Sequence, residues 1–303
     1  MIILADGTDV SSYISTITWS GDISQMARKL SFDYLYTDLG GVAQVEITVG
    51  SRVTMHSDSG KLLFDGVAIT EEFDEAEIKK SIQAADYAFY LKNEVYGEFT
   101  GTPSSVASMV LGMFGIGTGQ VFDAGGEVSI VATGDKTIYQ ILTEACASVE
   151  EGINIYMTGT AVNIEMAGAR PAGVVTGDDS VISAKYKSSM ENLINRVAVI
   201  DGKSELVMNV DSEDTQYGTV QKVYKHDDQK KDAMEEAKKL FHSLENSGSV
   251  TVRGDVNFTA GRSIIVEKVN SKIQGMFLIT SDSHTFSSGQ HTASLTLDFS
   301  GMV

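Results

Sequence analysis

The feature that most constrains the fold is a series of short segments, at both ends of the chain, in which apolar and polar residues alternate. Within residues 28–36, for example, Leu30, Phe32 and Tyr34 lie two positions apart and share one face of a strand. Turn signals rich in glycine and serine separate the segments. In the first third, strands are predicted at residues 13–19, 28–36, 44–49, 52–56 and 61–70, and at 77–90, where a helix also fits the pattern.

A weak internal repeat links the two ends of the chain. Residues 50–53 (GSRV) begin a pair of strands that continues through Gly66, and residues 261–264 (GRSI) begin a pair that continues through Gly275. In both copies a polar stretch and a long alternating strand follow. Chance similarity between two β-hairpins is the alternative explanation. If the repeat is genuine, two copies of one β-barrel unit flank the middle of the chain.

The middle third has a different pattern, typical of a small α+β domain. Thr102-Pro103 predicts the start of a helix that runs to Phe114, because Thr is a favourable N-cap and Pro a favourable first helical residue. Asp135 is predicted to cap a second helix, Lys136–Val149, whose apolar residues fall on one face. A β-hairpin is expected at residues 153–166.

The last third returns to strands and contains one long predicted helix. Strands are expected at residues 193–200, 205–210 and 218–226, with a closing hairpin at 281–299. The helix is predicted at about 228–246, capped by Asp227 or Asp228. Its buried stripe would contain Ala233, Ala237, Leu240, Phe241 and Leu244.

The predicted fold class is therefore mainly β with an α+β insertion. Two similar β-barrel domains, residues 1–95 and 186–303, flank a small α+β domain at residues 96–185. The one long helix belongs to the second β domain.

The composition excludes several classes of protein. The 303 residues include 41 Asp and Glu against 23 Lys and Arg, a formal net charge of −18. Because phosphate binding relies on Lys and Arg, we expect no sequence-specific binding to nucleic acid. No apolar run reaches the roughly 18 residues of a membrane-spanning helix, and the first residues lack the features of a signal peptide. We therefore expect no membrane insertion by the chain itself.

The residues available for catalysis or metal binding form no recognised motif. Cys146, the single cysteine, is predicted to be a small apolar helix residue rather than a nucleophile. His284 and His291 lie on the two strands of the closing hairpin, but in the predicted register His291 faces Phe286, which disfavours a zinc pair. The glycine-rich stretch 112–119 lacks the Lys and Ser/Thr of a phosphate-binding loop. We predict no catalytic residue, no metal ligand and no cofactor, which leaves binding as the function.

Residues 71–77 (EEFDEAE) form a strongly acidic stretch. They contain five acids in seven residues, which repel one another and favour contact with water. The simplest interpretation is an exposed turn between two strands.

Several segments, in their order along the chain, resemble phage tail hub proteins. Residues 19–22 (WSGD) and 27–32 (ARKLSF) resemble the opening of these proteins, and residues 191–197 (ENLINRV) resemble the start of their second barrel. Residues 284–297 (HTFSSGQHTASLTL) are similar to the closing hairpin of the late control protein D and baseplate hub group. The order and spacing of the segments are more specific than any one of them.

The resemblance implies the baseplate hub of a contractile injection particle, either a phage tail or an R-type bacteriocin. In that family, two similar β-barrel tube domains per chain form a homotrimeric, pseudo-sixfold ring. The ring joins the tail tube protein to the central spike protein among other baseplate proteins, and its channel conducts genome or tape-measure protein. Such a protein is made in the bacterial cytoplasm and becomes part of the virion or bacteriocin baseplate.

The resemblance also suggests a role for the acidic stretch. A negatively charged channel would not bind passing DNA. We therefore hypothesise that Glu71, Glu72, Asp74 and Glu75 line the channel or its mouth.

Two other functions remain open from the sequence. One is a tail-associated cell-wall hydrolase, and the other is an extracellular glycan-binding module. Lysin relatives of the hub family add a muralytic domain, whereas this sequence ends soon after the last predicted strand. We therefore expect no enzymatic activity.

Overall fold

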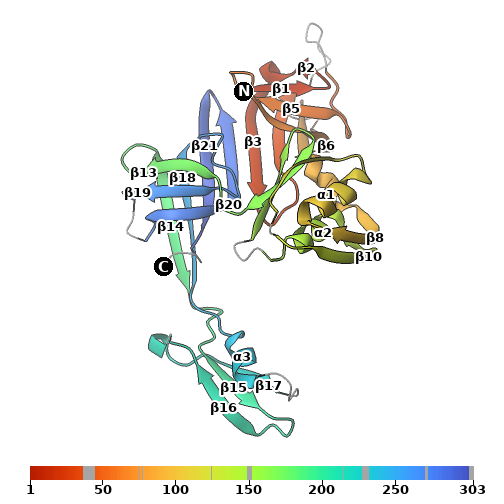
Figure 1. The fold of residues 1–303 in the computed structure, drawn as a ribbon. Helices are drawn as coiled ribbons and strands as arrows, with labels where there is room; N and C mark the ends of the chain where they lie inside the picture. Colours follow the sequence, from red (N-terminus) through yellow and green to blue (C-terminus); the bar gives the residue numbers. More distant parts are fainter. Residues whose placement is uncertain are drawn as a thin grey trace. The chain divides into compact units, whose positions relative to one another are not determined.

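The computed structural model describes residues 1–36, 45–74, 76, 78–123, 125–148, 152–213, 215–226, 232–269 and 272–299. The chain forms two compact units (Figure 1). The first unit comprises Met1–Lys185 and Ser249–Val303, and the second comprises Tyr186–Gly248. The predicted division into residues 1–95, 96–185 and 186–303 places its boundaries elsewhere and stays a prediction.

The first third of the chain folds into a curled, open half-barrel of strands. Its strands are β1 (Ile2–Ala5), β2 (Thr8–Asp9), β3 (Ile14–Asp22), β4 (Lys29–Leu35), β5 (Arg52–His56), β6 (Leu62–Asp74) and β7 (Lys79–Asp86), with a 3₁₀ turn η1 (Ser11–Tyr13). They are hydrogen-bonded in the order β3-β4-β7-β6-β5-β1-β2.

The last third repeats this arrangement. Its strands are β13 (Pro171–Thr176), β14 (Val181–Ser189), β18 (Glu245–Arg253), β19 (Ser263–Glu267), β20 (Gly275–Ser287) and β21 (Gln290–Asp298). They follow the order β14-β18-β21-β20-β19-β13, which corresponds to the order β3-β4-β7-β6-β5-β1 of the first copy. The outermost pair differs in direction, because β13 is parallel to β19 whereas β1 is antiparallel to β5. The two copies are continuous, because β20 pairs antiparallel with β3 from Ser281↔Asp22 to Ser287↔Thr16.

The two copies share their local irregularities as well as their order. The long strand of each copy carries a register shift, between Ala68 and Thr70 in β6 and between Ile279 and Ser281 in β20. Just before β5, the N–H of Gly50 donates to Ala68 O at 2.8 Å, and before β19 the N–H of Gly261 donates to Ile279 O at 2.9 Å.

Both of these glycines adopt a positive φ, 95° for Gly50 and 85° for Gly261, a conformation that favours glycine over residues with a Cβ. The repeat seen in the sequence is therefore confirmed. So is the fold class, mainly β with two similar β units around an α+β insertion, although the units are open half-barrels rather than closed barrels.

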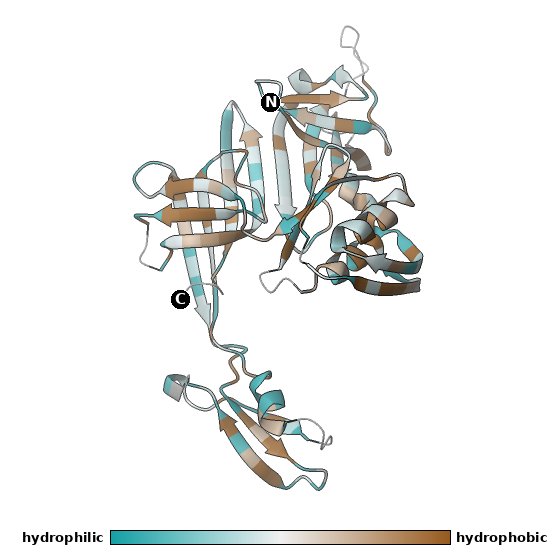
Figure 2. Ribbon diagram, viewed as in Figure 1, coloured by the Kyte–Doolittle hydropathy of each residue, from teal (hydrophilic) through white to brown (hydrophobic). Residues whose placement is uncertain are grey.

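The core of the first half-barrel follows from the predicted alternation. Leu30, Phe32 and Tyr34 are all at most 3% exposed, and they pack with Val53 and Ile82 from neighbouring strands. Bands of hydrophobic residues along these strands are visible in Figure 2. Burial of each such side chain contributes on the order of 1.5–3 kcal/mol to folding.

The middle of the chain forms an α+β layer with its own core. It contains η2 (Tyr87–Lys92), β8 (Glu94–Gly101), α1 (Pro103–Gly112), β9 (Gly117–Val121), β10 (Val128–Thr137), α2 (Ile138–Ala145), β11 (Ile153–Thr158) and β12 (Ala161–Met166). Thr102 caps α1, as predicted, by accepting a hydrogen bond from the N–H of Ser105. Cys146 follows α2 and is buried, and burial raises the pKa of its thiol, in keeping with a structural role.

The predicted start of the second helix is wrong. Asp135 lies within β10, where its carboxylate accepts a hydrogen bond from the N–H of Thr133 at 2.9 Å. Thr137 caps α2 instead, in a reciprocal capping box with Gln140. The helix ends at Ala145, before the predicted end at Val149, a residue that lies outside the described part of the chain.

The second unit is a small sheet with one short helix. It contains β15 (Arg196–Ile200), β16 (Leu206–Asp211), η3 (Thr215–Tyr217), β17 (Gln221–Lys225) and α3 (Ala233–Lys238), with strand order β16-β15-β17. Val197, Val199, Val210 and Ala237 form its core.

The predicted long helix at about 228–246 is also wrong. Residues 227–231, including both proposed caps, lie outside the described residues, and Asp232 caps α3 through its side chain. The helix ends at Lys238. Beyond it, His242 forms an antiparallel bridge with Ile194, and β18 begins at Glu245. This backbone pairing replaces the last predicted helical turns.

Two predictions in the first third need correction. Residues 45–48 are not a strand, although Ile47 is fully buried, and Gln44 lies outside the described residues. The acidic stretch is not a simple turn, because β6 continues through it to Asp74.

Candidate functional site

The acidic residues singled out from the sequence lie at the exposed end of β6. Glu71, Glu72 and Asp74 are exposed, whereas Glu75 lies outside the described residues. A carboxylate oxygen of Glu71 is 3.7 Å from Nζ of the nearly buried Lys80. The structure thus places three acids together on one strand, and their place in a channel stays a prediction.

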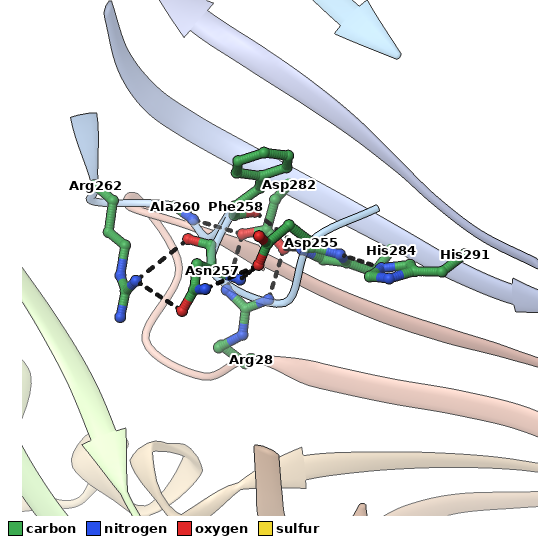
Figure 3. A network of polar contacts seen from close by, with 9 residues as sticks. All are labelled: Arg28, Asp255, Asn257, Phe258, Ala260, Arg262, Asp282, His284 and His291. Carbon is green, nitrogen blue, oxygen red and sulfur yellow. Dashed lines mark hydrogen bonds and ion pairs between the residues drawn. The ribbon is translucent and has the colours of Figure 1, made fainter. Parts of the chain in front are cut away.

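A polar network of other residues occupies the seam where β3 and β20 meet (Figure 3). The guanidinium of Arg28 donates to both oxygens of Asp282, at 2.8 Å and 2.6 Å. The Asp282 side chain is fully buried, and it also accepts a hydrogen bond from the N–H of Ala260 at 2.6 Å. Because Arg28 precedes β4 and Asp282 lies on β20, this ion pair joins the two half-barrels.

The charge state of Asp282 is set by its partners. Burial alone would raise its pKa, but the charge and hydrogen bonds of Arg28, with a contribution from His284, hold the pKa of Asp282 at about 2. The Arg28 guanidinium also stacks 4.2 Å above the ring of Trp19. The carboxylate is therefore ionised throughout the physiological range.

Two histidines extend the network along β20 and β21. Nε2 of the buried His284 lies 2.9 Å from Phe258 O, and Nδ1 of His284 lies 2.9 Å from Nε2 of His291. A carbonyl only accepts, so Nε2 of His284 carries a proton, and Nδ1 of His284 shares a hydrogen bond with Nε2 of His291. Burial and the neighbouring His284 lower the pKa of His291 to about 4. The His291 ring is therefore neutral at pH 7.

This arrangement does not suit a zinc ion. The facing nitrogens of His284 and His291 are hydrogen-bonded to each other, whereas zinc ligands must both aim a lone pair at the metal. The predicted register is confirmed, with Phe286 opposite His291, and the two histidines meet diagonally. Across the described residues, no three His, Cys, Asp or Glu side chains are grouped closely enough to hold a metal ion.

Gly254 allows His291 to occupy this position. A Cβ at residue 254 would lie 2.1 Å from the His291 ring, and the N–H of Gly254 donates to His291 O at 2.8 Å. Any side chain there would displace the ring from the network.

A cavity of about 290 Å³ lies beside the network, within the first unit. Its wall includes the β3–β4 connection, the start of β6, the end of β7, the β11–β12 hairpin and the loop that precedes β19. All three parts of the first unit, the two half-barrels and the α+β layer, therefore contribute to it. Arg28, Arg170 and Arg262 line it together with Trp19 and Tyr156.

An exposed row of apolar side chains crosses the outer strands of the second half-barrel. Val174 on β13 pairs with Ile265 on β19, which pairs with Met276 on β20. The three residues are 53%, 38% and 70% exposed. We call these residues the apolar row, and contiguous exposed apolar residues of this kind mark surfaces that bind other proteins.

Sequence reasoning missed the network and the cavity. Arg28 and Asp282 are 254 positions apart, so no local spacing relates them. A usable signal was present in Asp282, which shares one face of its strand with His284 and the apolar Phe286, because a charge on a buried face requires a partner.

The chain was compared with known proteins. A family described as YQBQ-like matches residues 17–298. No curated protein matches the sequence. Among the helices of the described residues, none has the length and apolar character needed to cross a membrane.

Solved structures share the fold over nearly the whole chain. The 43 kDa tail protein of prophage MuSo2 from Shewanella oneidensis is 17% identical, with a TM-score of 0.73, and the match covers 98% of this chain and 95% of that one. The tail protein from Neisseria meningitidis is 13% identical, with a TM-score of 0.68 and coverage of 99% and 96%.

A component of the type VI secretion system from E. coli is 9% identical, with a TM-score of 0.58 and coverage of 97% and 76%. Its description notes a similarity to T4 bacteriophage tail proteins. These likenesses confirm, at the level of the fold, the resemblance to tail hub proteins that the sequence motifs indicate.

Proposed function

The chain belongs to the YQBQ-like family, and from this premise we propose that it is a structural component of a phage-type tail baseplate, acting as the hub. The observation that carries the proposal is the pair of half-barrels with identical strand order, joined edge to edge by β3 and β20. The similarity of nearly the whole chain to the tail protein of prophage MuSo2 and to the tail protein from Neisseria meningitidis supports this proposal.

We infer that three chains form a ring. Each chain supplies two half-barrels with the same strand order, so a trimer would present six similar elements around one axis. Such a ring has threefold symmetry in its sequence and near-sixfold symmetry in its backbone. It could join a sixfold tail tube protein to a threefold central spike protein, as the hub role requires, with other baseplate proteins around it.

The apolar row is the proposed contact surface of this assembly. Exposed Val174, Ile265 and Met276 lie side by side on three paired strands, and association would remove them from water. Because these side chains point away from the core, a charged substitution should impair association more than folding.

The experiment is a measurement of solution mass by light scattering over a wide range of concentration. We expect a particle of three times 32.5 kDa, with a central opening in electron micrographs. Ile265→Asp should shift the mass towards the monomer, while Val131→Asp, at a more exposed apolar position on β10, should not. A stable dimer would contradict the hub, because a twofold assembly cannot match a threefold spike.

The proposal includes a non-enzymatic role. Neither alternative, a cell-wall hydrolase or a glycan-binding module, is favoured by a specific observation in the described residues. Release of peptidoglycan fragments by the purified protein would support the first, and binding on a glycan array would support the second. The hub predicts neither result.

We also propose that Glu71, Glu72, Asp74 and Glu75 face the channel, where genome or tape-measure protein would pass. Their exposure on β6 supports this for the first three residues. Lysine at two of these positions should slow the passage of DNA in the assembled particle, while leaving assembly intact. Unchanged delivery of DNA would show that these acids do not line the channel. On this proposal, the protein is made in the bacterial cytoplasm and ends in the baseplate of a phage or bacteriocin particle.

A further inference from the structure

The cavity of the first unit holds cationic hydrogen-bond donors that the described residues do not satisfy. Arg262 contributes its guanidinium to the wall, and only Nη1 has partners, Asn257 O and Oδ1, both at 3.4 Å. Among the described residues, no carboxylate forms an ion pair with Arg262. A guanidinium has five N–H donors, so most of them lack an acceptor here.

A second arginine of the wall is similarly incomplete. Nε of Arg170 forms an ion pair with Glu165 at 2.6 Å, and its guanidinium lies 4.1 Å from the centre of the Tyr156 ring. Its two terminal nitrogens have no hydrogen-bond partner among the described residues. The charges of Arg170 and Arg28 both act on Arg262, and burial together with Arg170 lowers the pKa of Arg262. Like charges are thus held close together in a partly buried space.

Further donors in the wall are buried without acceptors. Nε1 of Trp19, Nε of Arg28 and Nε of Arg262 are inaccessible to solvent and have no hydrogen-bond partner in the described part of the chain. Buried donors without partners are costly, on the order of 1–3 kcal/mol each. Of the three arginines that line the cavity, Arg28 is paired with Asp282 and Arg170 with Glu165, which leaves Arg262 without a paired carboxylate among the described residues.

The acids that line the cavity do not form an ion pair with Arg262. Asp65 is paired with Arg52 through two hydrogen bonds, at 2.9 Å and 2.7 Å. Burial raises the pKa of Asp86 to about 7, so near neutral pH this carboxyl is only partly ionised. Asp22 also lines the cavity and accepts hydrogen bonds from Ser24.

Part of the remaining wall is polar, from Lys61, Gln25 and Asn154, and part is apolar and indicates the shape of a ligand. Met26, Leu63, Ile155, Met157 and Val256 lie around the arginines. An inorganic ion would leave these side chains without contacts, whereas an acid on an apolar stem would use both parts. A volume of about 290 Å³ admits one such group and its first neighbours.

We propose that this cavity binds a carboxylate carried on an apolar stem, with Arg262 and Arg170 as its anchors. The carboxylate accepts two N–H bonds from the free side of Arg262, and the stem lies against Met157 and Val256. The carboxylate belongs either to the end of a peptide segment or to a small organic acid. This site is additional to the assembly role and does not depend on it.

Trp19 provides a direct reading of occupancy. It is the single tryptophan of the sequence and it lines the cavity. The full chain would be titrated, with tryptophan fluorescence and calorimetry as readouts, against acetyl-leucine, its neutral analogue acetyl-leucinamide, a tripeptide that ends in leucine, and inorganic phosphate. We expect acetyl-leucine to bind and acetyl-leucinamide to bind at least tenfold more weakly, because a charge-assisted pair contributes about 1.5–3 kcal/mol.

Variants assign the binding to the arginines. Arg262→Gln should weaken the binding of acetyl-leucine at least tenfold. It should not unfold the protein, since Arg262 forms only two long hydrogen bonds. Arg196→Gln, the same exchange in the second unit, is the matched control and should leave affinity unchanged. Met157→Glu would place a carboxylate inside the cavity and should abolish binding, while Met157→Gln should preserve most of it.

The outcomes separate the sources and the alternatives. Tighter binding of the tripeptide assigns the site to peptide ends, and equal binding assigns it to small acids. Equal affinity for acetyl-leucine and acetyl-leucinamide, phosphate binding as tight as that of acetyl-leucine, or unchanged affinity in both Arg262→Gln and Met157→Glu would overturn the proposal.

Discussion

At the scale of single residues, His291 couples stability to pH. Its pKa is lowered to about 4 in the folded chain, against an ordinary value of 6.5, so folding favours the neutral ring. The stabilisation is complete above pH 6.5 and is lost as the pH falls towards 4. The loss is at most about 1.4 kcal/mol per pH unit, and less where solvent screens the ring.

The variant His291→Gln tests this coupling. The amide can still form a hydrogen bond with Nδ1 of His284, but it does not titrate, and it loses the stacking of His291 on Phe286 at 4.1 Å. We expect a lower free energy of unfolding at pH 7 and a flatter pH dependence between 6.5 and 4, measured by urea unfolding. An unchanged slope would mean that another group causes the acid sensitivity.

Asp86 should have the opposite pH dependence. Burial raises its pKa from 3.8 to about 7, so the charged form is disfavoured in the folded chain. Stability is therefore lost as the pH rises from about 4 to 7. Asp86→Asn keeps the acceptor for the N–H of Ala88 and should stabilise the protein increasingly over this range, by up to about 1.4 kcal/mol per pH unit.

The matched control for this prediction is Glu98→Gln, an acid-to-amide exchange at an exposed position of β8. It should change stability little at any pH. If Asp86→Asn gives the same effect at pH 4.5 and pH 8, the carboxyl is ionised at both values and the prediction fails.

At the scale of elements, the start of α2 depends on one capping box. The Thr137 hydroxyl accepts from the N–H of Gln140 at 3.3 Å, and the Gln140 side chain accepts from the N–H of Thr137 at 2.8 Å. Thr137→Ala should lower the free energy of unfolding by about 1 kcal/mol. A double-mutant cycle with Gln140→Ala should show coupling, whereas additive losses would mean that the two bonds act independently.

Elements with a local pattern could be predicted from the sequence, and elements decided by distant contacts could not. The alternation around Leu30 located β4, and the residues predicted for β5, 52–56, are those observed. Asp135 and Thr137 are both good helix caps, and only the continued pairing of β10 with β8 excludes Asp135. The short α3 likewise depends on the bridge of His242 with Ile194.

The cavity could not be predicted from the sequence, because it too depends on contacts between distant segments. The acids of β6 stood out because they are neighbours along the chain. The cavity instead gathers Arg28, Arg170 and Arg262 from three distant segments, and each is unremarkable in its own surroundings. Pairing of β3 with β20 brings two of these segments together. Apart from the repeat, no feature of the sequence indicated that these two strands pair.

At the scale of the whole molecule, the two copies differ in what connects their matching strands. In the first copy, β3 and β4 are joined by residues 23–28. In the second copy, the equivalent strands β14 and β18 are joined through the second compact unit. This unit therefore occupies the position of a hairpin turn in the repeated topology.

The second unit should be removable without loss of the first. It has its own core of Val197, Val199, Val210 and Ala237, so its folding does not draw on the half-barrels. At its base, the strands β14 and β18 are held together by hydrogen bonds such as Tyr186 to Asn246 at 2.7 Å. An Asn-Gly turn in place of residues 190–244 would close these strands as a hairpin.

The shortened chain should unfold in one cooperative transition. Its melting temperature, measured by the fluorescence of Trp19, should lie within a few degrees of that of the half-barrels in the full chain. Closing a short loop instead of a long one favours folding slightly, because the entropy of loop closure grows with loop length. A chain that no longer melts cooperatively would show that the second unit is required for the repeat to fold. Retention of the fold with loss of the trimer would instead place part of the assembly surface on residues 190–244.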